Sequence, residues 1–216
     1  MPLLEAQSLV AGYGNFPVIG PVSFALERGE ILLVYGPNGV GKTTLLKTIA
    51  TILRPLSGSV LIEGEAAEKH RREIFYIPEV IDLPKRVKVK DYLKIVSLLY
   101  DGGGVEDTLA ELSLPGEARV DSLSQGLMRR LQLASSLVTR AQVYILDDPV
   151  VGLDDYAAEV LVPLILERLA ERGAVIVSTK EQRLIKALAG VTKVRLLNAL
   201  EYSRVTAGRT ELRSEQ

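Results

Sequence analysis

The sequence contains no cysteine and a single histidine, His70. Without cysteine, the chain has no disulfide framework, no thiolate ligand for zinc or an iron–sulfur cluster, and no cysteine nucleophile. With one histidine, a three-histidine zinc site is impossible, and a histidine-based catalytic triad would have to use His70. This residue lies in the charged segment 68–72, where we expect a surface side chain without a catalytic role.

An excess of one charge and a long hydrophobic run are also missing. The chain has 26 Lys and Arg against 27 Asp and Glu, a net charge of −1, so we expect no nucleic-acid partner. The longest apolar stretch, residues 160–166, is interrupted by Pro163 and is far shorter than the ~18–20 residues of a membrane span. The N-terminus lacks a signal-peptide pattern. We therefore expect a cytoplasmic protein.

The 216 residues predict one domain, or one domain with an inserted piece, and the 5% aromatic content predicts an aliphatic core. Strands are expected at 18–26, 31–35, 60–62, 73–77, 143–146 and 174–178, helices at 43–53, 89–100, 105–112, 126–137 and 155–172, and a hairpin at 191–197 with 200–205. Pro163 predicts a kink in the last helix. Buried strands that alternate with helices indicate an α/β fold with a mainly parallel sheet.

A phosphate-binding loop lies between a buried strand and the start of a helix. The pattern is complete in Gly36, Pro37, Asn38, Gly39, Val40, Gly41, Lys42 and Thr43. Glycines allow successive backbone N–H groups to surround phosphate oxygens, and the first helical turn, with Thr44, adds its free amides. Lys42 is expected to reach the β- and γ-phosphates, and the Thr43 hydroxyl to bind Mg²⁺.

Two aspartates, Asp147 and Asp148, follow the buried apolar run 143–146. Asp147 is placed to hold Mg²⁺ from the side opposite Thr43, and Asp148 to polarise an attacking water. The alternative is a strand that ends in two aspartates by chance.

Residues 123–127, Leu-Ser-Gln-Gly-Leu, resemble the signature motif of ATP-binding-cassette (ABC) ATPases, whose usual form is Leu-Ser-Gly-Gly-Gln. The resemblance covers residues 13 to about 200, and it implies a P-loop NTPase fold. Such a fold has a RecA-like core with a mainly parallel sheet, an N-terminal antiparallel β subdomain and a short inserted helical subdomain. It also implies a single nucleotide-binding domain over 1–216, with 1–78 and 139–205 as ATP-binding core and β subdomain, 79–138 as helical subdomain and 206–216 as a polar tail.

The same resemblance implies ATP and Mg²⁺ as cofactors and assigns further residues. Tyr13 matches the aromatic residue that stacks on adenine. Ser124, Gln125 and Gly126 of one subunit would contact the γ-phosphate held by Lys42 of another. Asp154 belongs to a loop that communicates between the two ATP sites of a dimer.

Several positions depart from the family pattern. Glu79 stands where a glutamine that touches Mg²⁺ and the attacking water is usual, Asp148 where a glutamate base is usual, and Lys180 where a histidine is usual. The signature motif also has Gln125 and Leu127 in place of glycine and glutamine. We interpret these changes as a degenerate site that still binds ATP and hydrolyses it by a slower or modified route, with Asp148, Glu79 and Lys180 as catalytic candidates and Thr43, Asp147 and Glu79 as Mg²⁺ ligands.

The function implied by the resemblance is that of the ATPase subunit of an ABC transporter. It would dimerise with a second ABC subunit, identical or different, and drive separate integral-membrane permease subunits from the inner face of the membrane. The alternatives are a soluble ABC ATPase of the iron–sulfur assembly type, and a weakly hydrolysing partner in a heterodimer. The basic segment 85–90 is either a solvated edge of the helical subdomain or a docking surface for a membrane partner or anionic lipid head groups.

Overall fold

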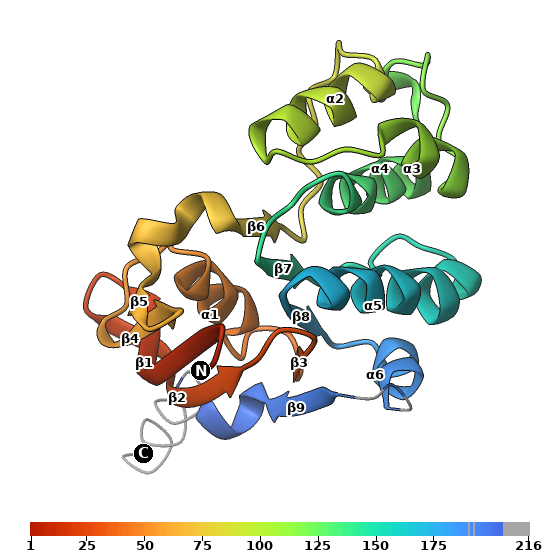
Figure 1. Ribbon diagram of the computed structural model, residues 1–216. Helices are drawn as coiled ribbons and strands as arrows, with labels where there is room; N and C mark the ends of the chain where they lie inside the picture. The colour runs from red at the N-terminus through yellow and green to blue at the C-terminus, as the bar shows by residue number, and fades with distance from the viewer. Residues whose placement is uncertain (190, 192, 205–216) are drawn as a thin grey trace.

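The computed structural model describes residues 1–189, 191 and 193–204, which form two β-sheets and a set of helices (Figure 1). The strands are β1 (Leu4–Tyr13), β2 (Phe16–Leu26), β3 (Ile31–Tyr35), β4 (Ser57–Ile62), β5 (Glu65–Ala66), β6 (Ile74–Ile77), β7 (Val143–Asp147), β8 (Ala174–Thr179) and β9 (Val194–Asn198). The helices are α1 (Lys42–Ile49), α2 (Val89–Leu99), α3 (Val105–Glu111), α4 (Gln125–Leu137), α5 (Val162–Arg172) and α6 (Gln182–Leu188). Within these ranges, no helix is long and apolar enough to span a membrane.

The central sheet is parallel, with strand order β6-β7-β8-β3-β9. The interior strands β7, β8 and β3 are apolar on both faces, and their successive side chains alternate between two cores. In β7, Tyr144 and Leu146 join the core beneath α4 and α5, while Val143 and Ile145 join the core that contains α1. A strand that is buried on both faces reads as a continuous apolar run, which is why the sequence predicts the interior strands of this sheet.

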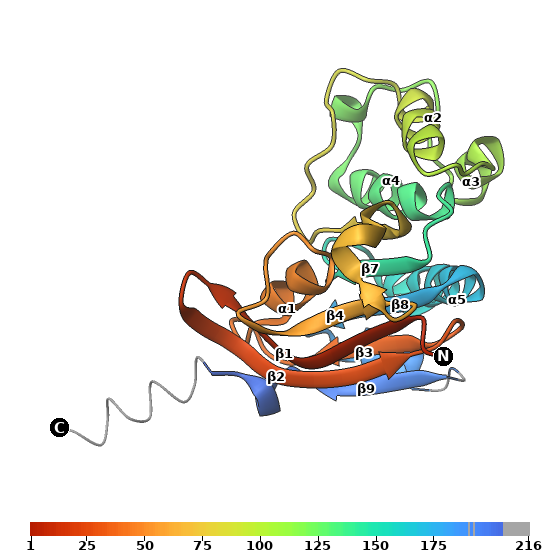
Figure 2. The same cartoon turned by 60° about the vertical axis from the view of Figure 1, so that its left-hand side comes forward.

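The second sheet is antiparallel, with order β2-β1-β4-β5. Helix α1 packs between the two sheets, contacts β1, β2, β7 and β8, and has most of its side chains buried. Helices α2, α3 and α4 lie together at the end of the molecule away from this sheet (Figures 1 and 2). The mainly parallel sheet, the antiparallel sheet and the helical section after β6 confirm the predicted fold class.

The predicted hairpin at 191–205 is wrong. Strand β9 lies parallel to β3 at the edge of the central sheet, with Leu33 opposite Leu196. The chain then turns through a 3₁₀ helix, Ala199–Tyr202, whose first turn is capped when the Asn198 side chain accepts a hydrogen bond from the Leu200 amide. Position 205 and the predicted tail 206–216 lie outside the described residues.

Other elements also differ from the sequence prediction. Strands β1 and β5 and helix α6 are not predicted. The long helix expected at 155–172 is continuous but contains a π-helical turn, Ala157–Leu161, just before Pro163. The wider turn accommodates the missing N–H group and the ring of Pro163, so the predicted kink takes the form of a π-bulge.

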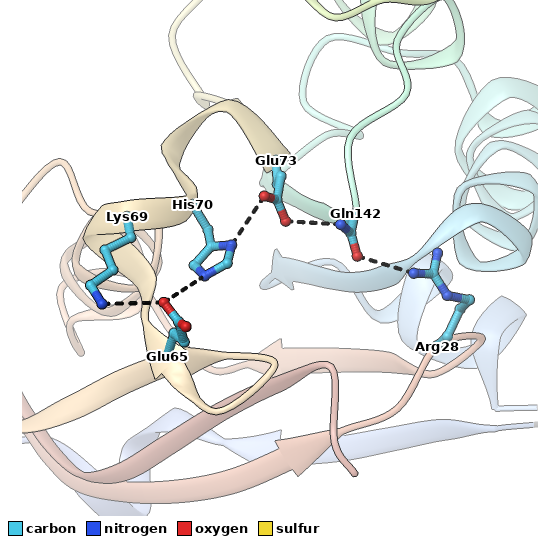
Figure 3. Close-up of polar contacts among 6 residues, drawn as sticks. All are labelled: Arg28, Glu65, Lys69, His70, Glu73 and Gln142. Carbon is cyan, nitrogen blue, oxygen red and sulfur yellow. Dashed lines mark hydrogen bonds and ion pairs between the residues drawn. The ribbon is translucent and has the colours of Figure 1, made fainter.

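His70 is not the exposed residue that we expect from its charged surroundings, because its side chain is only 17% exposed. Its Nδ1 lies 3.0 Å from Glu73 Oε1, and the other Glu73 oxygen accepts a hydrogen bond from Gln142 Nε2 at 2.8 Å (Figure 3). Gln142 Oε1 in turn accepts from Arg28 at 3.0 Å. These bonds connect the 3₁₀ helix Ala67–Glu73 to the start of β7 and to the turn before β3.

We expect Gln142→Ala to lower the free energy of unfolding by about 1–2 kcal/mol, because it breaks two hydrogen bonds and leaves Glu73 and Arg28 without their shared partner. Denaturant unfolding measures this loss. The matched control is Gln7→Ala, which removes one bond between exposed side chains and should cost less than about 0.5 kcal/mol. Equal effects of the two substitutions would contradict the structural role of Gln142.

Candidate functional site

The candidate site lies at the carboxyl edge of the central sheet. The phosphate loop (residues 36–43) follows β3, Asp148 follows β7, and Lys180 follows β8. Parallel pairing places these strand ends side by side, with Tyr35 opposite Thr179. Polar groups converge at this edge because every strand ends there, which is the usual ligand position in open α/β sheets.

The phosphate loop is shaped by glycine. Gly41 caps the N-terminus of α1 with φ of 103°, and a Cβ at this position would lie 2.9 Å from side-chain carbons of Val18 and Ile19. The Lys42 ammonium donates hydrogen bonds to the carbonyl oxygens of Gly36 at 2.8 Å and Pro37 at 3.0 Å. The loop therefore curls around its own lysine, with the first amides of α1 at its base.

Burial lowers the pKa of Lys42, and the negative charges of Asp148, Asp147 and Glu79 oppose this shift. The ammonium is thus held among carboxylates while it is largely removed from water. An incoming phosphate would offer it stronger, charge-assisted hydrogen bonds than the two neutral carbonyls do.

Both carboxylate oxygens of Asp147 have a partner. Ser178 Oγ donates to Oδ1 at 2.5 Å, and the Tyr76 hydroxyl donates to Oδ2 at 3.3 Å. Burial and the Asp147 charge raise the pKa of Tyr76, so this hydroxyl stays protonated and remains a donor. Two neutral donors fix the direction of the carboxylate and leave lone pairs for a cation.

Asp148 adopts a left-handed backbone conformation, with φ of 46°, which is uncommon for a residue other than glycine. Its amide donates to the Ser178 carbonyl and hydroxyl oxygens, and its Oδ1 accepts from Thr179 Oγ1 at 3.2 Å. Burial raises the pKa of Asp148, while the Thr179 hydrogen bond and Lys42 oppose the shift. A carboxyl group with a raised pKa is a better proton acceptor once it is ionised.

These groups line one cavity of about 260 Å³. Its walls are formed by Val18, Asn38, Gly39, Gly41, Lys42, Thr43, Thr44, Glu79, Asp147 and Asp148. Among the described residues, no group of three or more His, Cys, Asp or Glu side chains is arranged to hold a metal by itself. The oxygen donors Thr43, Asp147 and Glu79 nevertheless fit Mg²⁺, which is usually bound by one or two carboxylates together with substrate phosphates and water.

The structure brings Lys180 to the same edge, but its side chain is exposed. The Gly36 amide donates a hydrogen bond to the Thr179 carbonyl, so the main chain at Lys180 lies beside the phosphate loop. Its positive charge adds to the lowering of the Lys42 pKa and opposes the rise in the Asp148 pKa. Lys180 therefore lies within electrostatic range of the cavity.

The signature motif lies away from the phosphate loop. Ser124, Gly126 and Asp154 line a separate cavity of about 370 Å³, and Gln125 begins α4 beside them. The two cavities share no residue. Tyr13 is half exposed at the end of β1 and lines neither cavity. Pro37 and Val40 support the loop rather than line the cavity, and Val40 packs into the core.

The structure also reveals a polar residue that sequence reasoning missed. Arg129 is buried on the first turns of α4 and forms hydrogen bonds with the main chain around Glu79 and with Val151. A signal is present in the sequence. Arg129 and Gln132 stand three residues apart on the helical face that continues to the buried Leu133 and Ser136, where apolar residues are usual.

Comparison with known proteins identifies the family. A family model described as "ABC transporter" matches residues 19–151. The chain belongs to the ABC transporter family. This ABC subunit is 35% identical over 179 residues to a protein of Ruegeria sp. named Cytochrome c biogenesis ATP-binding export protein CcmA, covering 82% of this chain and 84% of that protein. It is also 35% identical to the protein of the same name from Rhodobacter capsulatus, covering 83% and 81%.

A solved ABC transporter ATP-binding protein of Pyrococcus furiosus matches the structure of this ABC subunit with a TM-score of 0.83 and 38% identity, covering 93% of this chain and 98% of that one. An ATP-binding subunit of another ABC transporter matches with a TM-score of 0.77 and 27% identity. The prediction of an ABC transporter ATPase subunit is confirmed. The degenerate character of its site and the roles of individual residues remain predictions.

We expect Lys42→Ala to weaken MgATP binding about 100-fold or more, because two charge-assisted hydrogen bonds are lost at about 1.5–3 kcal/mol each. Isothermal titration calorimetry measures this. Lys47→Ala, which removes a lysine on the same helix outside the cavity, is the control and should bind normally. Retained affinity in Lys42→Ala would contradict the site.

Proposed function

We propose that this ABC ATPase subunit binds MgATP in the cavity at the carboxyl edge of the central sheet and pairs with a second ABC subunit to drive separate membrane permease subunits. The observation that carries the proposal is the shared cavity, which is lined by Lys42, Thr43, Glu79, Asp147 and Asp148. It combines a phosphate loop, oxygen ligands suited to Mg²⁺ and a buried carboxylate base. The curated relatives are export proteins by name, which favours transport over the iron–sulfur assembly alternative.

In the proposed reaction the lysines bind the phosphates, and the oxygen-bearing side chains bind Mg²⁺ or accept a proton. Lys42 binds the β- and γ-phosphate oxygens, and Lys180 adds positive charge beside the γ-phosphate. Thr43, Asp147 and Glu79 would hold Mg²⁺, which supplies charge neutralisation when bound. Water attacks the γ-phosphorus, the bond between this phosphorus and the oxygen that bridges to ADP breaks, and the water proton passes to Asp148.

Pairing follows from the separation of the two cavities. Because Ser124 and Gly126 lie outside the phosphate-loop cavity of their own chain, we propose that they meet the γ-phosphate bound by another subunit. Ser124 caps the N-terminus of α4, so the first amides and the positive dipole end of this helix would face the phosphate. A phosphate would then be bound by helix N-termini from both subunits.

We propose that helix α2 contributes to the permease contact. Ile95, Leu98 and Leu99 lie on one exposed face of this helix, and Leu98 is 81% exposed. Exposed apolar side chains at helical spacing are typical of protein–protein contact. The neighbouring basic segment is partly neutralised, since Lys88 pairs with Glu117. We therefore place the contact on the apolar face.

We expect Asp148→Glu to raise the ATP turnover rate about threefold to tenfold, because the added methylene carries the carboxylate away from Thr179 and farther into the cavity. A well-placed general base accelerates a reaction about 10²–10⁴-fold, so an improved position can produce an increase of this size. Asp148→Asn, which removes the base, is the opposite control and should lower turnover. Phosphate-release kinetics at saturating MgATP measure both. An unchanged or slower rate in Asp148→Glu would show that the shorter carboxylate does not limit hydrolysis.

We expect Leu98→Glu to reduce co-purification of a membrane permease at least tenfold while the basal ATPase rate stays within twofold, because a charge replaces apolar contact area. Leu164→Glu, an equally drastic change at an exposed position of α5, is the control. Loss of the permease in both variants, or in neither, would argue against a specific contact through α2.

A further inference from the structure

Arg129 is a buried cation whose hydrogen-bond partners are all neutral. The residue is only 2% exposed. Its Nε donates to the Val151 carbonyl at 3.1 Å, and its Nη1 donates to Gln132 Oε1 at 2.7 Å and to the Pro78 carbonyl at 3.4 Å. Its Nη2 donates to the Glu79 carbonyl. Within the described residues no carboxylate pairs with it directly.

A buried charge without a direct counter-ion is strongly destabilising unless nearby charges offset it. Burial lowers the pKa of Arg129, and the charges of Asp148, Glu79 and Asp147 act against this shift. The guanidinium therefore lies in the field of the three site carboxylates although it touches none of them. A purely structural link between loops would not require a charged group.

The guanidinium also joins three segments of the site. It connects α4 to the main chain at Pro78 and Glu79, which follows β6, and to Val151, which follows the Asp148 turn. Gln132 strengthens the first connection, since its Nε2 donates to the Pro78 carbonyl at 3.0 Å. The planar fork of an arginine can reach all three directions at once, whereas a lysine ammonium cannot.

We propose that Arg129 is a positioning residue that acts through Glu79: it holds the Glu79 main chain in place and offsets the negative charge that this glutamate adds to the nucleotide site. The proposal rests on the proposed function, because it concerns the carboxylate placed next to Mg²⁺ and the γ-phosphate. With Arg129 included, the three carboxylates Glu79, Asp147 and Asp148 are matched by three cations, the others being Lys42 and Lys180.

A double-mutant cycle between Arg129 and Glu79 tests this coupling. Single-turnover hydrolysis, with the protein in excess over MgATP, is measured for Arg129→Gln, Glu79→Gln and the double variant. We expect Arg129→Gln to lower the hydrolysis rate at least tenfold when Glu79 is present, but no more than twofold in the Glu79→Gln background. The KM for ATP, measured separately with ATP in excess, should change less than threefold because the phosphate loop is untouched. An equal loss in both backgrounds would overturn the proposal.

Two further variants separate charge from folding. Gln132→Leu keeps the guanidinium but removes both the Gln132 bond to the Pro78 carbonyl and the bond that Gln132 accepts from Arg129. It should lower the hydrolysis rate about threefold and raise the Mg²⁺ concentration needed for the half-maximal rate. Arg129→Lys keeps the positive charge but lacks the planar guanidinium group. Its hydrolysis rate should lie between the rates of Arg129→Gln and the unmodified protein. If Arg129→Gln does not fold, the cycle is repeated with Arg129→Lys, and an unchanged rate in both Gln132→Leu and Arg129→Lys would overturn the proposal.

The controls distinguish this proposal from the proposed function. Arg168→Gln removes an arginine that pairs with Glu111 on α3, away from the site, and should hydrolyse ATP normally. If Lys42→Ala still hydrolyses ATP, the proposed site itself is wrong. If Lys42→Ala is inactive while the Arg129 and Gln132 variants behave like Arg168→Gln, only the positioning role of Arg129 is wrong.

Discussion

The balance of buried charge at the carboxyl edge of the central sheet is the constraint on which the rest of the site depends. Asp147, Asp148, Lys42 and Arg129 are all nearly removed from water within one small region. Each would be costly alone, and each is tolerated because the others are close. The apolar strands on both sides supply the hydrophobic stabilisation and set the parallel register that brings these groups together.

The same balance gives a physical interpretation of how this chain differs from the usual family pattern. In the sequence prediction, Glu79 stands where a neutral glutamine is usual, and Lys180 stands where a histidine is usual. The two replacements add one negative and one positive charge when the histidine is neutral, so the net charge of the site is conserved although its distribution changes. Asp148 keeps the charge of the usual glutamate but holds it closer to the main chain, where Thr179 binds it. We therefore interpret the site as rearranged around its charges.

Local sequence was sufficient for those parts of the protein whose structure is set by neighbouring residues. The phosphate loop and the Asp147–Asp148 pair are local, because a strand, a glycine turn and a helix start follow one another directly in the chain. Strand β1 was missed because its alternation is broken by bulges, with Ser8 at a positive φ. The hairpin at 191–205 was wrong because apolar periodicity does not specify which strand is the partner.

The Arg129 contacts could not be predicted for a different reason. They join residues about 50 positions apart in the sequence and use main-chain carbonyls, which carry no sequence signal. Only the folded structure shows that a polar residue on the buried face of α4 lies against the Glu79 main chain. The sequence indicated that the face is unusual, but it did not indicate the partners.

Nucleotide-dependent self-association tests most directly whether the two separate cavities form composite ATP sites. Sedimentation velocity would be measured on the Asp148→Asn variant, which should hold ATP without hydrolysing it. If the subunit forms homodimers, a second copy of the chain supplies the signature motif. MgATP should then convert the protein to a dimer, while MgADP should leave it monomeric. A protein that binds MgATP with full affinity and stays monomeric, even when mixed with a co-purified second ABC subunit, would contradict the composite site.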